Sequence, residues 1–218
     1  MSLKIQQNSN LKETERYIQN HFENEGSGHD WWHIHRVRNV ALKLAETEGG
    51  DKFIVEMAAL LHDLDDWKLN IESEISKVEK WLDDLNISNY VRKEILEIIG
   101  QVSFKGAGVE NKAISIEAKV VQDADRLDAI GAIGIARTFA YGGSKGRLIY
   151  HPDAKPKMHD NFEEYKKNTA PTINHFYEKL LLLKNLLNTD SAKKLAEKRH
   201  GYMEDFLTQF YAEWENKM

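Results

Sequence analysis

The sequence predicts an all-helical protein that folds as a single domain over residues 1–218. Three observations point to helices: the chain contains only three prolines, its apolar residues recur at helical spacing over long stretches, and consecutive β-branched residues are few. A chain of 218 residues can also bury a substantial core. We therefore expect a helical bundle.

Composition excludes several classes of function. The net charge of −5 gives no general affinity for nucleic acid or acidic membranes, so a small anionic substrate must be held by local cations. Because the chain has no cysteine, disulfides and thiolate sites are ruled out, and a metal site must use His, Asp, Glu and water. With no hydrophobic signal region and no stretch suited to spanning a membrane, we expect a cytoplasmic protein, either a monomer or a homodimer.

Two helices are expected in the first fifty residues. The first begins near Asn10 and ends at the glycine-containing loop 25–28, after which Asp30 can cap the second. His33 lies on the apolar stripe of this second helix, which is formed by Val37, Val40, Ala41 and Leu44. His33 is therefore either an inward-facing ligand or a structural core histidine.

Residues 58–68 carry ionisable groups where helical spacing predicts burial. A run of small and apolar residues leads into His62 and Asp63, and further carboxylates and a lysine follow. A buried carboxylate without compensation is strongly unfavourable, whereas a divalent metal ion would compensate both side chains together. The alternative is a core histidine satisfied by a backbone carbonyl, beside an N-capping aspartate.

Two scaffold helices are predicted between residues 71 and 102, and a loop follows at 103–111. One long helix over 113–141 would then place Asp125 and Asp128 on an apolar stripe. Two carboxylates one turn apart suit a metal ligand and a partner that holds it. A salt bridge to Arg126 or another arginine is the alternative.

The last third combines a basic glycine-rich segment with two more helices. Residues 142–147 include Lys145 and Arg147 but lack the GxxxxGK[ST] pattern of a Walker loop. They form either a clamp for phosphates or a flexible surface loop, and we expect mobility over about 142–168. The helices of 169–218, beginning near Thr172 and Asp190, should pack on the core.

The order of His33, the pair His62-Asp63 and Asp125 resembles the H…HD…D signature of the HD superfamily of metal-dependent phosphohydrolases, over roughly residues 29–132. Other segments, such as Asp65-Asp66-Trp67-Lys68, are similar to a bacterial subgroup called YedJ-like or YpgQ-like. The resemblance implies an all-helical fold, metal binding by these four residues and nucleotide pyrophosphohydrolase activity. Two-metal HD enzymes add histidines before the last aspartate, but this chain has none over 64–124, so one ion is expected.

Nitrogen and oxygen ligands favour Mn²⁺, with Fe²⁺, Co²⁺, Mg²⁺ or Ni²⁺ as alternatives. Such an ion acidifies water for attack on phosphorus while a carboxylate takes the proton. Asp66, about one turn beyond the HD pair, is the first candidate for that base and Asp65 the second, with helix capping as the alternative for both. Asp128 would hold the ligand shell. Candidate phosphate contacts are Lys68, Lys105, Lys145 and Arg147, each with a solvated surface charge as the alternative.

The sequence therefore favours an enzyme that converts a (deoxy)nucleoside triphosphate to the monophosphate and pyrophosphate. The choice of the α-phosphorus rests on the resemblance alone. Within the superfamily, a phosphomonoesterase or phosphodiesterase is the alternative. A nucleotide-sensing module without turnover is the alternative of another class.

Overall fold

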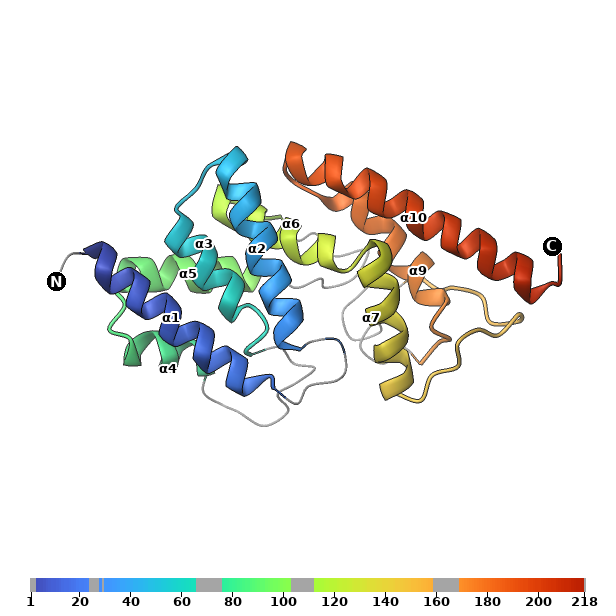
Figure 1. Cartoon of the computed structure of the whole chain (residues 1–218), viewed down its shortest axis with the longest axis horizontal. Helices are drawn as coiled ribbons and strands as arrows, with labels where there is room; N and C mark the ends of the chain where they lie inside the picture. Colours follow the sequence, from blue (N-terminus) through green and yellow to red (C-terminus); the bar gives the residue numbers. More distant parts are fainter. Residues whose placement is uncertain are drawn as a thin grey trace. The chain divides into compact units, whose positions relative to one another are not determined.

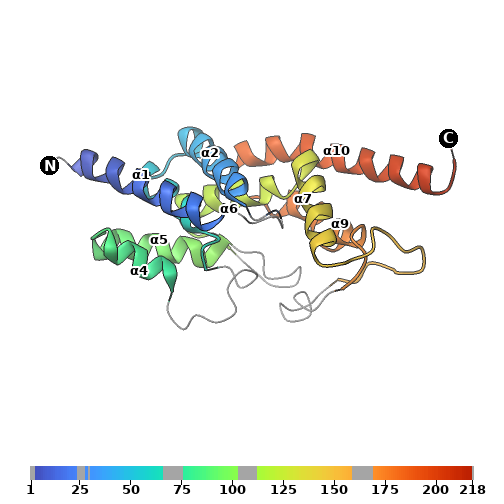
Figure 2. The same ribbon diagram turned by 60° about the horizontal axis from the view of Figure 1, so that its bottom comes forward.

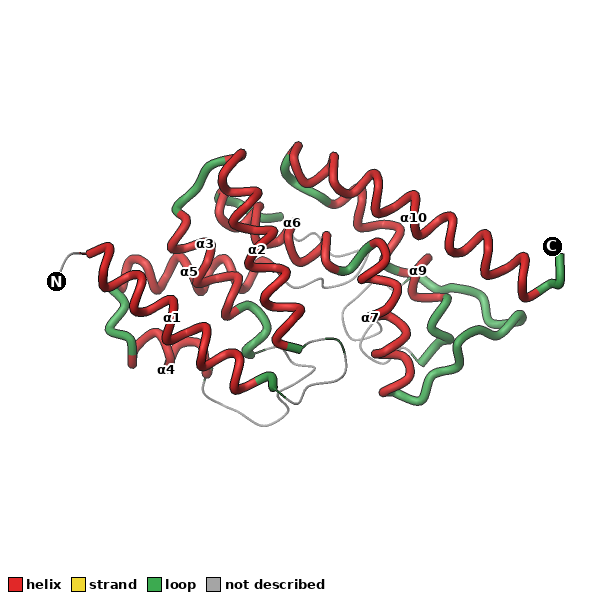
Figure 3. Tube along the Cα trace, in the orientation of Figure 1, coloured by secondary structure: helices red, strands yellow, loops and turns green. Residues whose placement is uncertain are grey.

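The structure, a computed structural model, describes residues 3–23, 28, 30–65, 76–102, 112–158 and 169–217. Within these ranges every regular element is a helix (Figure 3), which confirms the predicted all-helical fold. None of the helices in these ranges is long and apolar enough to cross a membrane. The chain divides into two compact units, and the expectation of a single domain stays a prediction.

The first unit comprises Met1–Ser103 and Lys112–Ala124. Its elements, in blue to yellow-green in Figure 1, are α1 (Leu3–His21), α2 (Trp31–Glu48), α3 (Lys52–Leu61), α4 (Lys77–Asp84), α5 (Asn89–Val102) and the first part of α6 (Ile116–Asp128). The predicted start of the first helix at Asn10 is wrong. Asn10 is buried inside α1, where its side-chain oxygen accepts a hydrogen bond of 2.9 Å from Gln6.

Helix α3 is the centre of the first unit. It packs against α1, α2 and α5 (Figures 1 and 2), and apolar residues on all of its sides are buried: Phe53, Ile54, Val55, Met57, Ala58, Ala59, Leu60 and Leu61. A helix that is apolar all round is stable only when it is surrounded. Asp51 fixes its start by accepting from the backbone N–H groups of Phe53 and Ile54 at 2.8 and 3.2 Å.

The second unit comprises Phe104–Asn111 and Asp125–Met218. It contains the end of α6, then α7 (Gly131–Ser144), α9 (Asn174–Glu178), the 3₁₀ helix η1 (Leu180–Leu186) and α10 (Asp190–Trp214). Helix α10 packs on α7 and η1. Three aromatic rings from α7, α9 and α10 pack together: the centroid of Phe206 lies 6.0 Å from that of Phe139 and 5.7 Å from that of the buried Phe176.

Two boundaries differ from the sequence expectations. The single helix predicted over 113–141 is wrong, because α6 ends at Asp128 and α7 begins at Gly131, whose φ of +78° is a conformation that glycine adopts readily. The loop predicted over about 142–168 begins later, since α7 continues to Ser144; residues 145–158 are turn and coil, and 159–168 lie outside the described ranges. The last helices begin close to the predicted residues, at Asn174 and Asp190.

Gly142, in the last turn of α7, allows a close backbone approach inside the second unit. A Cβ atom at this position would overlap Thr172 Oγ1 and lie 3.1 Å from its Cγ2. Thr172 is fixed there because its N–H donates to the carbonyl of Leu148 at 2.8 Å, and the N–H of Ile173 donates to that of Ile149 at 3.0 Å. A side chain at position 142 therefore cannot be accommodated by a small local movement.

We predict that Gly142→Ala destabilises the protein by about 1–3 kcal/mol, the usual effect of overpacking. Gly143→Ala is the matched control, because it lies in the same turn and a Cβ there would meet no atom within 4 Å. The control should be neutral or stabilising by up to about 1 kcal/mol. Urea denaturation measures both, and equal effects of the two changes would contradict the close-packing argument.

Candidate metal centre

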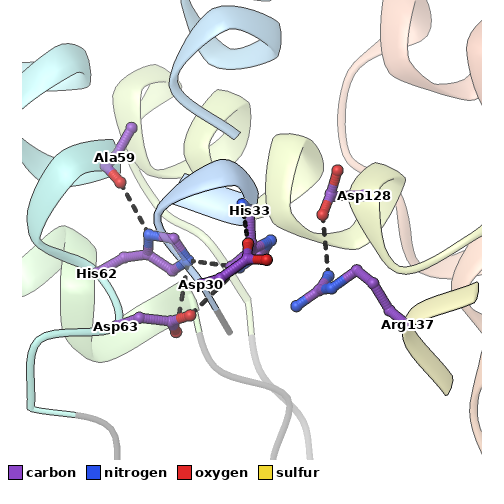
Figure 4. Close-up of polar contacts among 7 residues, drawn as sticks. All are labelled: Asp30, His33, Ala59, His62, Asp63, Asp128 and Arg137. Atoms are coloured by element: carbon purple, nitrogen blue, oxygen red, sulfur yellow. Dashed lines mark hydrogen bonds and ion pairs between the residues drawn. The ribbon is translucent and has the colours of Figure 1, made fainter. Parts of the chain in front are cut away.

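Three buried side chains of the first unit converge on one point. His33 lies in the first turn of α2, while His62 and Asp63 lie in the turn that follows α3, and one ligand atom from each is within 4.8 Å of the other two (Figure 4). The exposed fraction is 0% for His33 and 4% for both His62 and Asp63. The structure thus brings together three of the four metal ligands predicted from the sequence.

Local structure places each of these side chains. Asp30 caps α2 by accepting from the backbone N–H of His33 at 2.8 Å, which puts His33 on the buried side of the first turn. Helix α3 ends at Leu61, so His62 and Asp63 occupy a turn rather than a helical face, and Leu64 N–H closes this turn on the Leu61 carbonyl at 3.1 Å. The HD pair therefore lies directly after the C-terminal end of the buried helix α3.

The tautomer of the neutral His62 ring follows from its neighbour Ala59. Its Nδ1 lies 2.8 Å from the carbonyl oxygen of Ala59 (Figure 4), and because a carbonyl can only accept, Nδ1 carries the proton and donates it. In the neutral ring, Nε2 then presents a lone pair. That nitrogen lies 3.3 Å from His33 Nε2 and 3.4 Å from Asp63 Oδ1, and His33 Nε2 lies 3.2 Å from Asp63 Oδ2.

This arrangement fits a divalent cation. His62 Nε2 and the Asp63 carboxylate lie close together in a buried space, so positive charge between them is favourable, from a proton on His33 or from a metal ion. Imidazole nitrogens with a carboxylate oxygen are a donor set for Mn²⁺, Fe²⁺ and Co²⁺. The hydrogen bond from His62 to a backbone carbonyl is also the usual support for a metal-bound histidine.

Asp125 and Asp128 lie at the end of α6, in the second unit. The assignment of Asp125 as the fourth ligand stays a prediction. Asp128 is buried, and its Oδ2 pairs with Arg137 Nη1 of α7 at 2.9 Å. The salt-bridge alternative, which named Arg126 or another arginine, therefore describes Asp128, whose partner is Arg137; the Arg126 guanidinium donates to the carbonyl of Leu186.

Asp65 is placed in a structural role. Its exposed carboxylate accepts hydrogen bonds from Ser76 Oγ at 2.7 Å and from the backbone N–H groups of Lys77 and Val78 at 3.0 and 3.2 Å. These donors lie at the start of α4, so this geometry favours the capping alternative over the catalytic one. Asp66, the first candidate for the base, lies outside the described residues.

The proposed phosphate contacts are described only in part. Lys145 Nζ and the Arg147 guanidinium carbon lie 5.6 and 5.5 Å from the ring centroid of Tyr141, so one ring holds both cations near the end of α7. Lys68 and Lys105 lie outside the described residues. Sequence reasoning did not find the roles of Tyr141 and Arg137, because their partners are set by tertiary packing.

Comparisons with known proteins agree with this geometry. Residues 31–130 match the family model of the HD domain. The chain is 41% identical over 205 residues to Bacillus subtilis YpgQ, covering 91% of this chain and 92% of YpgQ. The crystal structure of YpgQ in complex with ADP gives a TM-score of 0.74 at 38% identity, with 93% of this chain and 97% of that one covered.

Two further solved structures are similar over nearly the whole chain. An HD-superfamily hydrolase from Bacillus thuringiensis is 47% identical, with a TM-score of 0.73 and coverage of 97% of this chain and 100% of that one. A protein from Lactobacillus plantarum has a TM-score of 0.88 at 39% identity and covers 96% of this chain and 98% of its own. These similarities extend through both compact units.

We predict that Asp63→Ala abolishes binding of Mn²⁺, because the variant removes the only anionic member of the buried three-residue group. The unsubstituted protein should retain one ion per chain after gel filtration, as measured by elemental analysis. Asp153→Ala, which removes an exposed carboxylate, is the control and should bind like the unsubstituted protein. An Asp63→Ala protein that keeps one ion would refute this site.

Proposed function

This chain belongs to the HD superfamily of metal-dependent phosphohydrolases, and on that premise we propose that its substrate is a nucleotide. The reaction we propose converts a nucleoside triphosphate to the monophosphate and pyrophosphate. The observation that carries the proposal is the buried group of His33, His62 and Asp63, whose nitrogen and oxygen atoms are close enough to hold one metal ion. The ADP bound to YpgQ, a relative 41% identical to this chain, supports a nucleotide as the ligand.

In this proposal His33, His62, Asp63 and Asp125 hold one divalent ion, with Mn²⁺ favoured. When bound, the ion supplies an acidified water and positive charge beside the attacked phosphorus. The protein orients the ligands: the hydrogen bond to the Ala59 carbonyl holds the His62 ring so that Nε2 faces the proposed metal position without rearrangement. Burial of all three described ligands excludes bulk water, which strengthens their interaction with a cation.

Asp66 is the proposed proton acceptor. It follows Asp63 closely in the sequence, and a carboxylate within hydrogen-bond reach of a water beside the metal ligands could accept its proton. The three hydrogen bonds that Asp65 accepts from the start of α4 support Asp66 over Asp65. Asp128, paired with Arg137, is proposed to hold the turn that carries Asp125.

Lys145 and Arg147 are the proposed phosphate contacts, with Lys68 and Lys105 as further candidates. The chain has a net charge of −5, so a triphosphate must be attracted by local cations rather than by the overall field. The two cations lie 5.6 and 5.5 Å from the centre of the Tyr141 ring, so both are near the end of α7 and a polyphosphate could contact both.

Hydrolysis in ¹⁸O-labelled water tests the reaction. With a nucleoside triphosphate and Mn²⁺, we expect one ¹⁸O atom in the nucleoside monophosphate and none in pyrophosphate, as read by mass spectrometry. Label in pyrophosphate or orthophosphate would overturn attack at the α-phosphorus. Release of orthophosphate from nucleoside monophosphates would identify a phosphomonoesterase, and nucleotide binding without any product would identify a sensing module.

A set of variants tests the assigned roles. Asp66→Asn should retain the metal, and its kcat should be lower by about 10²–10⁴-fold, the usual effect of losing a general base. Asp65→Asn is the matched neighbour; it should leave kcat unchanged and lower the free energy of unfolding by about 0.5–2 kcal/mol through weaker capping of α4. The double change Lys145→Ala with Arg147→Ala should raise KM more than it lowers kcat.

Steady-state kinetics, metal content and urea denaturation of each variant distinguish these roles. A large loss of kcat in Asp65→Asn with normal turnover in Asp66→Asn would reverse the two assignments. An unchanged KM in the double variant would remove Lys145 and Arg147 from substrate binding.

A further inference from the structure

We propose that Arg199 of α10 is a positioning residue that sets the affinity of the metal site by fixing the turn that carries Asp125. This inference rests on the proposed function, in which Asp125 is the fourth ligand. It assigns to the C-terminal helix a role in the site although α10 supplies none of the proposed ligands. The supporting contacts all lie within the second unit.

Arg199 closes the C-terminal end of α6. Its guanidinium Nη1 donates to the carbonyl oxygen of Leu127, two residues after Asp125. The last carbonyls of a helix lack partners within the helix and carry a partial negative charge, so a cation is a favourable partner there. The end of the turn is further closed by the N–H groups of Ala129 and Ile130, which donate to the carbonyls of Asp125 and Leu127 at 3.2 and 3.3 Å.

Gly131 lets the stem of Arg199 pack directly on this turn. A Cβ atom at position 131 would lie 3.0 Å from Arg199 Cβ and 3.1 Å from its Cγ, closer than an ordinary van der Waals contact. The φ of Gly131 is +78°, so its backbone also favours glycine. Arg199 therefore contacts the turn through both its stem and its guanidinium.

Charged side chains bind the same turn to two helices. Burial lowers the pKa of Arg199 below its usual value, and the charge of the Asp128 carboxylate opposes this shift. Asp128 also pairs with Arg137 of α7 at 2.9 Å. Such a network contributes little to net stability, because desolvation offsets the attraction, but it restricts the turn to one geometry.

A restricted turn matters for a metal ligand. Asp125 is half-buried in the final turn of α6. In the same turn, Arg199 contacts a backbone carbonyl and Arg137 contacts the carboxylate of Asp128. A ligand functions only when it is held near its productive position, and loss of a supporting contact typically weakens metal binding about 10–100-fold. The contacts of Arg199 provide such support to Asp125.

The experiment measures Mn²⁺ affinity by electron paramagnetic resonance of the free ion, and thermal unfolding of the metal-free protein alongside. Arg199→Met keeps the stem but removes the donor, and should weaken Mn²⁺ binding about 10–100-fold. Arg199→Lys should restore part of the affinity. Lys198→Met, which removes an exposed charge from the same helix, should bind like the unsubstituted protein.

A double-mutant cycle separates positioning from a general loss of stability. If Arg199 acts through Asp125, Arg199→Met should have no further effect on Mn²⁺ affinity in an Asp125→Asn background. A folded Arg199→Met protein with a lower Tm and unchanged affinity would overturn the inference. Should that variant not fold, Gly131→Ala displaces the stem instead, and unchanged affinity in it would overturn the inference equally.

The two proposals fail in different ways. Unchanged Mn²⁺ affinity in Asp125→Asn would overturn the assignment of the fourth ligand itself. Loss of affinity in Asp125→Asn together with unchanged affinity in Arg199→Met would leave that assignment intact and remove only Arg199 from the site.

Discussion

The carboxylate of Asp63 lies among buried side chains, and the first unit is arranged around the need to compensate its charge. His33 and His62 approach its two oxygens at 3.2 and 3.4 Å. Because the Ala59 carbonyl accepts a hydrogen bond from His62 Nδ1–H, the other nitrogen of the neutral ring presents a lone pair toward Asp63. A buried carboxylate close to a lone pair favours added positive charge, which a divalent ion would supply to all three side chains.

The hydrophobic effect makes this arrangement possible. Helix α3 is apolar on all of its sides and packs against three other helices, so its C-terminal end, and the turn that follows, are held inside the unit. Capping by Asp51 and Asp30 sets where α3 and α2 begin. The positions of His33, His62 and Asp63 therefore follow from ordinary helix capping and burial.

The second unit uses charge differently. Its arginines act largely on backbone carbonyls: Arg199 on Leu127 and Arg126 on Leu186, while Arg137 pairs with Asp128. Guanidinium groups suit this task because they present several fixed donors and stay charged when partly buried. The result is a turn after α6 whose polar groups are held from two other helices, in agreement with a positioning role.

The sequence by itself determined the helical fold, the burial of His33 and the pairing of His62 with Asp63, because helical periodicity and residue order are local properties of the chain. It misplaced the start of α1 and missed the break at Gly131, since an apolar pattern continues across that residue and its close approach to Arg199 is a tertiary contact. Only the tertiary structure decided that Asp65 caps α4 and that Arg137 pairs with Asp128, because these partners lie 11 and 9 residues away at positions that no spacing rule specifies.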